Sequence, residues 1–238
     1  MVDNIRFSRL NESAFTRPEI QHMILKKLGT GIQILNVVET HTTPKLEYGL
    51  QKKYPNLTFF FNHGDKQANR EFHKEGRKGT MIIVVNDLFK IGEFKIHVTG
   101  QLSTLRLQIG PREYNFISIY APSEKETEKS IRYFKNLFQP SIIVPTMCNI
   151  LAGDWNCWLH EKDYLNYVNW TKYRPRTQEI IKNAIVEHGP VDPFTTMNEE
   201  YEITENSGYT YRGRKRGNSD RPAVRSRIDY FFHLRGTL

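Results

Sequence analysis

Short apolar runs, separated by polar turn residues, recur along most of the chain. Their length and their content of branched and aromatic residues are typical of strands. The predicted strands are residues 31–39, Leu57–Phe61, Gly79–Val85, Glu93–Val98, Thr104–Gln108, Tyr114–Tyr120, Asn149–Ala152, Tyr209–Tyr211 and Ile228–Phe232. Many short strands with such punctuation indicate a sandwich.

Three segments have the period of a helix instead. Thr16–Glu19 is a capping box with proline in the first turn, and it opens a helix that ends before Gly29. A second capping box, Ser123–Glu126, opens another helix, and a third helix is predicted at about Arg174–His188. Residues 1–15 and 62–78 show no clear period. Since no linker or repeat separates these elements, we expect a single domain over residues 1–238.

The chain of 238 residues has a formal net charge of +8, which favours a polyanionic partner, although basic charge also serves solubility. No apolar run approaches the length of a membrane span, and the first residues lack the layout of a signal peptide. Its two cysteines, Cys148 and Cys157, lack metal-site spacing and are expected to be reduced thiols. We therefore expect a nuclear or cytoplasmic protein, neither secreted nor bound in a membrane.

Basic charge is concentrated near the end of the chain. Between Arg212 and Arg227 there are seven basic residues and one acid, Asp220, which leaves +6 of the total +8 in one short stretch. The stretch lies between two predicted strands and contains glycine and proline. The pattern predicts a long basic hairpin, which is either a solvated loop or a loop that grips phosphates.

The stretch Leu151-Ala152-Gly153-Asp154-Trp155-Asn156 places two polar side chains after a short apolar strand. On extended backbone, residues i and i+2 point to the same face, so Asp154 and Asn156 are predicted to project together. A carboxylate can orient or deprotonate a water, and an amide can hydrogen-bond a phosphate oxygen. Alone the motif is weak, because Gly-Asp before a turn is ordinary loop chemistry.

Three other stretches also carry a polar residue near a predicted strand end. With the first they form an ordered set: Val38-Glu39-Thr40-His41, Ile119-Tyr120-Ala121-Pro122, Gly153-Asp154-Trp155-Asn156 and Ser226-Arg227-Ile228-Asp229-Tyr230. This set resembles the endonuclease/exonuclease/phosphatase superfamily, whose fold is that of DNase I. Together with the Tyr209-Thr210 pair, it is most similar to the apurinic-type endonuclease domain of non-LTR (LINE-type) retrotransposons. The resemblance covers about residues 4–232.

The resemblance implies an α/β fold, a four-layer αββα sandwich with the site at one rim. It implies a DNA endonuclease that nicks target DNA for retrotransposition by phosphodiester hydrolysis. Glu39 would bind Mg²⁺ or Mn²⁺, and hard carboxylate ligation suits both ions. Tyr120 and Asn156 would contact the scissile phosphate, and Asp154 would orient or activate the attacking water. Asp229 would hydrogen-bond a histidine that assists hydrolysis.

The resemblance also implies contacts with duplex DNA. Asn4 corresponds to the asparagine of the family's opening strand, although the glycine that usually follows is missing. Thr210 would position a phosphate, and the segment between Thr210 and Asp229 resembles a variable hairpin that approaches the minor groove. Its candidate phosphate contacts are Arg212, Arg214, Lys215, Arg216, Arg221 and Arg225. A downstream reverse-transcriptase region of the same polyprotein is the expected further partner.

The sequence departs from the family near its end. Members continue to a Ser-Asp-His element on a closing strand, whereas this sequence has nine residues after Asp229 and no such element. His233 is a poor replacement, because it lies about 13 Å along the same strand. We therefore expect a sandwich that lacks its last strand, with impaired catalysis and with Phe231 and Phe232 exposed at a sheet edge.

Two other functions stay open. The chain is either a fragment that binds nucleic acid without cleaving it, or another phosphodiesterase or phosphatase of the superfamily. The basic hairpin argues against a small substrate, because small anions need only a few cations. Cleavage of plasmid DNA with magnesium separates the endonuclease from the fragment that only binds.

Overall fold

The structure, a computed structural model, describes residues 7–11, 18–28, 32–40, 42, 44–64, 79–122, 127–157, 159, 164–165, 175–192, 211–212, 225–226 and 229–234. Its helices are α1 (Pro18–Leu28), α2 (Pro44–Lys53), α3 (Thr127–Leu137) and α4 (Pro175–His188). Its strands are β1 (Phe7–Asn11), β2 (Ile34–Val38), β3 (Leu57–His63), β4 (Gly79–Val85), β5 (Lys90–Val98), β6 (Leu102–Ile109), β7 (Arg112–Tyr120), β8 (Cys148–Asp154), β9 (Tyr164–Leu165), β10 (Tyr211–Arg212), β11 (Arg225–Ser226) and β12 (Asp229–Leu234).

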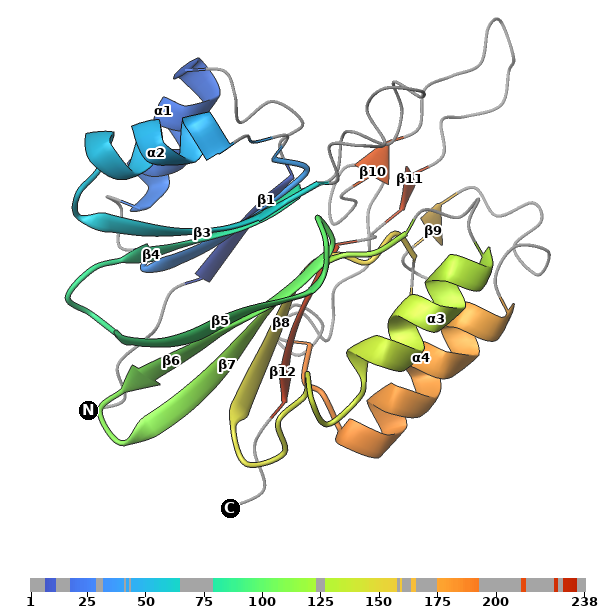
Figure 1. Cartoon of the computed structure of the whole chain (residues 1–238). Coiled ribbons are helices and arrows are strands. Elements are labelled where there is room, and N and C mark those ends of the chain that lie inside the picture. Colours follow the sequence, from blue (N-terminus) through green and yellow to red (C-terminus); the bar gives the residue numbers. More distant parts are fainter. Residues whose placement is uncertain are drawn as a thin grey trace, which may run out of the picture.

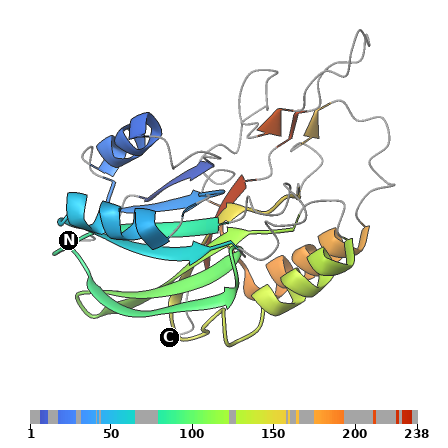
Figure 2. The same cartoon turned by 45° about the horizontal axis from the view of Figure 1, so that its top comes forward.

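Two sheets pack face to face between two pairs of helices (Figures 1 and 2). The first sheet has the strand order β1-β2-β4-β3, and the second has the order β12-β8-β7-β6-β5. Helices α1 and α2 lie on the outer face of the first sheet, and α3 and α4 lie on the outer face of the second. The predicted αββα sandwich is therefore confirmed. A small ribbon, β10-β11-β9, lies beyond the end of the two sheets.

Strand β2 shows how the alternation of side chains builds these layers. Leu35 and Val37 are fully buried in the cluster that joins the first sheet to α1 and α2. Ile34 points the other way and belongs to the cluster between the sheets, with Phe116 and Ile150 of the second sheet. Because successive side chains of a strand point to opposite faces, an apolar run buried on both faces suits a central strand.

One polar residue interrupts this packing. Asn36, also fully buried, points between the sheets. Its Nδ2 donates to the carbonyl of Ala152 at 2.8 Å, and its Oδ1 accepts from the hydroxyl of Ser118 at 2.6 Å. Both partners belong to the second sheet. Since a buried polar group costs free energy unless it is paired, this amide favours one relative placement of the sheets.

Two elements of the first sheet's half escaped the sequence prediction. Helix α2 has its apolar positions at Leu46 and Leu50, interrupted by Gly49, and its remaining residues are mostly polar. The available signals were the proline at its start and Lys52 and Lys53 in its last turn. Strand β1 lies in the stretch 1–15 that showed no period. No helix within the described residues is long and apolar enough to cross a membrane.

The end of the chain differs from the prediction in two ways. The basic segment is closed by β10 and β11, which pair Tyr211 with Ser226, so its second strand is not the one that contains Asp229. Strand β12 instead pairs antiparallel with β8 as the outer described strand of the second sheet. Phe232 is 4% exposed within the core, and Phe231 is partly buried between the sheets. The expectation that both rings lie exposed was therefore wrong.

We expect Asn36→Ala to lower the free energy of unfolding by about 2–4 kcal/mol, because it leaves two buried groups of the second sheet without their partner and opens a small cavity. Chemical denaturation measures the loss. Gln139→Ala is the control, because its amide also donates to a backbone carbonyl, that of Lys135, but in solvent. The control should change stability by less than about 0.5 kcal/mol.

Candidate active site

Three of the predicted site residues are neighbours across three strands of the second sheet. Strand β7 pairs in parallel with β8, and the register places Tyr120 opposite Asp154. Strand β12 pairs antiparallel with β8, so Asp229 lies on the other side of Asp154. Parallel strands end at the same edge of a sheet, and β12 begins there. The rim thus brings together three side chains that are far apart in the sequence.

Glu39 reaches this rim from the first sheet. It directly follows β2 and has φ 56°, a left-handed conformation that costs a residue with a side chain about 1–2 kcal/mol. The hydroxyl of Tyr120 donates to Glu39 Oε1 at 2.7 Å. The half-buried carboxylate is therefore held at the junction of the two sheets, which is where the resemblance implied a metal ligand.

The turn after β8 differs from the prediction. Asn156 has φ 49°, so the backbone after Asp154 is not the extended strand that the prediction assumed. The buried Oδ1 of Asp154 instead accepts from the backbone N–H of Asn156 at 2.8 Å. Asn156 Nδ2 donates to the carbonyl of Ala121 at 2.8 Å. Such a turn, closed by an aspartate side chain, is typical of Asp-x-Asn sequences.

Gly153 is required by a close contact between strands. Its φ is +152°, and a Cβ atom at this position would lie 1.8 Å from the carbonyl oxygen of Ile119. Only glycine lets β8 approach β7 so closely. The residue therefore places Asp154 beside Tyr120 on the neighbouring strand.

Trp155 anchors the same turn in the core. It is 1% exposed, and its ring stacks on Phe134 of α3 with centroids 5.7 Å apart. Phe232 of β12 meets it edge-on at 5.1 Å. Tyr230 lies edge-on at 6.3 Å, and its hydroxyl accepts from the N–H of Leu159, beyond the turn. Aromatic contacts of this kind stabilise beyond their burial, so the turn is held on both sides.

His233 lies far from the rim, as expected. It pairs with Ile150, four positions along β12 from Asp229, and its Nε2 lies 2.9 Å from Cys148 Sγ. Burial raises the pKa of the Cys148 thiol, which the charge of Arg112 opposes. Neither cysteine forms a disulfide, in agreement with the expected reduced thiols.

Several predicted DNA contacts lie outside the described residues. They are Asn4, Thr210, Arg214, Lys215, Arg216 and Arg221. Arg212 and Arg225 are placed by their backbones alone, which pair with each other where β10 meets β11. The predicted basic hairpin therefore has an observed base, and β9 joins it as a third strand that the sequence did not reveal.

The structure draws attention to an asparagine that sequence reasoning passed over. Asn11 ends β1 and pairs in parallel with Val38, the residue before Glu39. Asn4 precedes the start of β1, where Phe7 pairs with the far end of β2. Asn11 is therefore the asparagine whose register brings it to the rim. No periodicity in the sequence marked the strand that carries it.

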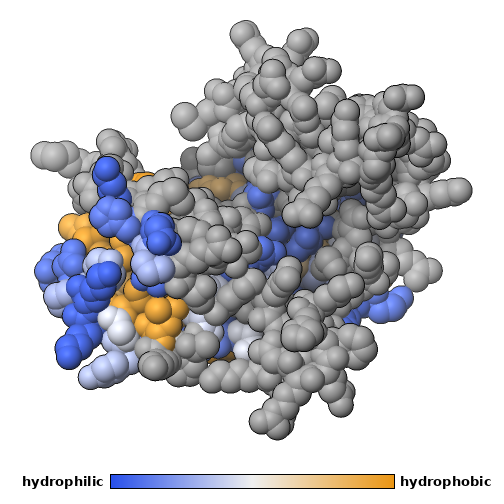
Figure 3. All heavy atoms as spheres, turned by 90° about the horizontal axis from the view of Figure 1, so that it is seen from above, coloured by the Kyte–Doolittle hydropathy of each residue, from blue (hydrophilic) through white to orange (hydrophobic). Residues whose placement is uncertain are grey.

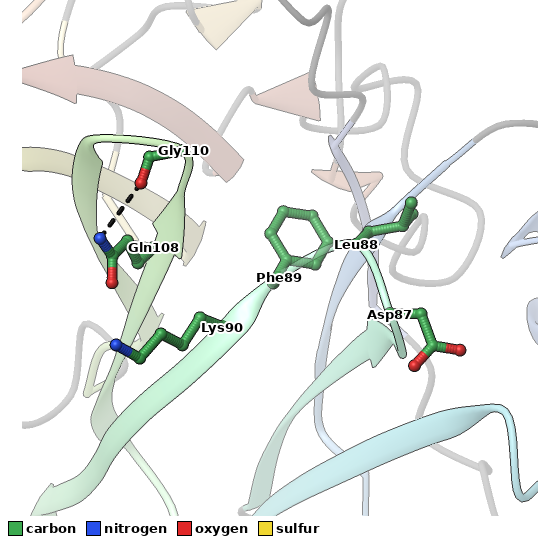
Figure 4. Close-up of a pocket in the computed structure, with 6 residues that line it drawn as sticks. All are labelled: Asp87, Leu88, Phe89, Lys90, Gln108 and Gly110. Atoms are coloured by element: carbon green, nitrogen blue, oxygen red, sulfur yellow. Dashed lines mark hydrogen bonds between the residues drawn. The ribbon is translucent and has the colours of Figure 1, made fainter.

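A polar surface and a separate cavity can be distinguished among the described residues. Seen from above in Figure 3, hydrophilic side chains gather in a hollow at the centre of the face. A cavity of about 430 Å³ lies elsewhere, lined by residues that include Asp87, Lys90 and Gln108 (Figure 4). It adjoins the turns that precede β5 and β7, at the opposite end of the strands from Tyr120.

Solved structures with the same architecture define the fold class. The AP endonuclease LMAP from Leishmania major matches with a TM-score of 0.71 at 12% identity, over 97% of this chain and 79% of that chain. TDP2 from D. rerio, complexed with single strand DNA product, matches with a TM-score of 0.65 at 14% identity, over 98% and 84%. The chain thus has the DNase I-like fold that these structures share, as its motifs indicated.

Two comparisons concern transposable elements. The endonuclease domain of TRAS1, a telomere-specific non-LTR retrotransposon, matches with a TM-score of 0.61 at 14% identity, over 97% of this chain and 85% of that chain. The Transposon TX1 uncharacterized 149 kDa protein of Xenopus laevis is 24% identical over 203 residues, which are 82% of this chain and 14% of that protein. The chain thus spans only a small part of the TX1 protein. No protein-family model matches the sequence.

We expect Gly153→Ala to lower the free energy of unfolding by about 3 kcal/mol or more, because the new methyl group must displace backbone. Thermal and chemical denaturation measure the change. Gly49→Ala is the matched control, since Gly49 lies in α2 and no atom lies within 4 Å of the added Cβ. The control should stabilise by about 0.5–1 kcal/mol, as alanine favours a helix interior. Equal effects at both sites would contradict the steric argument.

Proposed function

We propose that this chain is a divalent-metal-dependent DNA endonuclease that hydrolyses phosphodiester bonds. The observation that carries the proposal is the junction of the two sheets, where the hydroxyl of Tyr120 donates to Glu39 at 2.7 Å. Asp154 lies opposite Tyr120 in the same rim. The rim thus combines a carboxylate that can bind a cation, a phenol and a second, buried carboxylate. Together these groups can support attack on a phosphate.

Each residue has a role that follows from its chemistry. Asp154, buried and held by the N–H of Asn156, orients the attacking water and accepts its proton. The second hydrogen of the Asn156 amide would donate to a phosphate oxygen without adding negative charge, and the phenol of Tyr120 would turn its single O–H from Glu39 to the phosphate when substrate binds. Asp229 lies beside Asp154 in the sheet, where it would orient a catalytic histidine, but His233 of the same strand lies too far from the rim to be that residue.

The rim fits magnesium or manganese. No three His, Cys, Asp or Glu side chains of the described residues form a ready-made metal cage. Mg²⁺ does not need one, because it is commonly bound by one or two carboxylates together with water and substrate phosphate. Glu39 would supply the carboxylate, and Asn11 lies close to it in the chain fold, because its backbone pairs with Val38. The cation would neutralise charge on the phosphate.

DNA is the proposed substrate, because the basic segment opens from the β10–β11 hairpin and concentrates +6 of the net charge of +8. Such a stretch can follow the phosphates of a duplex and enter its minor groove. The TRAS1 and TX1 comparisons favour nicking of target DNA by a mobile element. In that setting a reverse-transcriptase region of the same polyprotein is the proposed partner.

We expect the chain to convert supercoiled plasmid to open circles in Mg²⁺, and expect Glu39→Gln to lower this rate on the order of a hundredfold or more. The half-maximal Mg²⁺ concentration should rise as well, since one hard anionic ligand is lost. Glu113→Gln is the control, because this carboxylate is exposed at the other end of β7. If wild type binds DNA but leaves it intact, the chain is a binding fragment. Hydrolysis of small phosphate esters alone would point to a phosphatase.

We expect replacement of Arg214, Lys215 and Arg216 by alanine to weaken binding to duplex DNA. Each lost phosphate contact should reduce the slope of log affinity against log salt by about 0.9. Fluorescence anisotropy at several salt concentrations measures both quantities. The control removes an equal charge from the exposed face of α3, at Lys129, Arg132 and Lys135. Equal effects of the two triple variants would mean that only total charge matters.

A further inference from the structure

The last two residues of β3 connect to the two halves of the rim in opposite directions. Asn62 is 1% exposed and forms hydrogen bonds with the second sheet. His63 contacts the segment that follows β2 and a residue of α2. Adjacent residues of a strand point to opposite faces, so the end of β3 can bond the second sheet through one residue and the segment after β2 through the next. Neither residue belongs to the proposed catalytic set.

Asn62 uses both ends of its amide on a single turn. Its Nδ2 donates to the carbonyl of Val98 at 3.0 Å, and its Oδ1 accepts from the N–H of Gly100 at 2.6 Å. Val98 ends β5, and Gly100 has the left-handed φ of 68° in the turn to β6. The side-chain amide of Asn62, in the first sheet, therefore forms two hydrogen bonds with the backbone of the second sheet.

The next residue of that turn carries the contact to the rim. The carbonyl of Gln101 accepts from the N–H of Tyr120 at 2.7 Å, and its side-chain Nε2 donates to the carbonyl of Tyr120 at 3.3 Å. The buried hydroxyl of Tyr133 donates to the same Gln101 carbonyl at 3.2 Å. Burial raises the pKa of Tyr133 far above its usual range, so this hydroxyl stays a donor. The turn gripped by Asn62 thus fixes the backbone of Tyr120.

His63 contacts the other half of the rim, the segment that carries Glu39. Its Nδ1 lies 3.1 Å from Thr42 Oγ1, and its Nε2 lies 3.0 Å from a carboxylate oxygen of Glu47 in α2. Thr42 Oγ1 in turn lies 3.3 Å from Thr40 Oγ1. Thr40 directly follows Glu39, whose backbone is strained. These contacts resist relaxation of the strained segment, because each polar group in the series is already engaged.

We propose that the end of β3 is a positioning element, in which Asn62 sets Tyr120 and His63 sets Glu39, so that the two side chains meet. The catalytic consequence rests on the proposed function, whereas the geometric consequence does not. Both are positioning residues, because they act through Gln101 and Thr42. A shift of about 1 Å in a reacting group can cost a hundredfold in rate, so such support matters.

A double-mutant cycle in thermal stability tests the geometric part without any need for activity. Tyr120→Phe removes the hydroxyl that bonds Glu39. If Asn62 maintains that bond, Asn62→Ala already weakens it, and the double variant should lose less melting temperature than the sum of the single losses. His63→Ala should behave in the same way. Should Asn62→Ala not fold, Asn62→Asp replaces it, since this variant keeps the acceptor for Gly100 but sets a carboxylate oxygen, in place of the donor, against the carbonyl of Val98.

Asn115→Ala provides the matched control. Asn115 is also 1% exposed, and its Nδ2 donates to the carbonyl of Ile142 at 2.6 Å and to Asn149 Oδ1 at 2.8 Å. It lies on β7 itself but near the opposite end from Tyr120, about 16 Å away along the strand. The drop in melting temperature caused by Asn115→Ala should simply add to the drop caused by Tyr120→Phe. Additive losses for Asn62 and His63 as well would overturn the proposal.

Plasmid nicking tests the catalytic part. At a temperature where all variants are folded, Asn62→Ala should lower kcat by roughly tenfold to a hundredfold. Asn62→Asp should restore part of the rate, and Asn115→Ala should leave it unchanged. Unchanged nicking by folded Asn62→Ala would falsify the positioning role. If wild type does not nick DNA at all, the proposed function fails, and the melting cycle still decides whether β3 positions Tyr120 and Glu39.

Discussion

The hydrogen bond from Tyr120 to Glu39 joins side chains that belong to different sheets, and the rim depends on it. Neither sheet contains the candidate site alone, so the relative placement of the sheets sets the distance between the two groups. That placement is maintained by apolar packing between the sheets and by Asn36, which bonds across them at 2.8 and 2.6 Å. Protein interiors are packed as densely as organic crystals, so a shift of one sheet is resisted throughout the interface.

The Gly-Asp-Trp-Asn stretch shows how much tertiary constraint four residues can carry. Gly153 permits the close approach of β8 to β7, and Asp154 then closes the following turn through the N–H of Asn156. Trp155 points the other way, into the aromatic cluster below α3. As a sequence the stretch resembles any loop that follows a strand. Its specificity comes from three different neighbours, each supplied by a distant part of the chain.

The fold was predictable where side-chain alternation is strong. Gly79–Val85 was predicted with the bounds that the structure has, because an apolar run buried on both faces allows few other interpretations. Helix α2 was missed since most of its surface faces solvent and Gly49 weakens its period. Strand β1 was missed because five residues of mixed polarity at a sheet edge carry little pattern. The same weakness hid Asn11, the last residue of this strand, from the sequence analysis.

The sequence by itself determined that the chain is a sandwich, the order of the four motifs and the concentration of basic charge between Arg212 and Arg227, whereas the αββα layering was implied only by the family resemblance. These properties depend on local periodicity, on short spacings and on composition, all of which can be read directly from the sequence. Only the tertiary structure decided that Glu39 meets Tyr120 across 81 positions, or that Asn62 grips the turn before Gln101. The physical reason is that a hydrogen-bond donor accepts any suitable acceptor within reach, so the local sequence around Glu39 or Asn62 does not identify the partner. Such contacts leave no residue-specific trace, so only the packed chain reveals which distant segments they join.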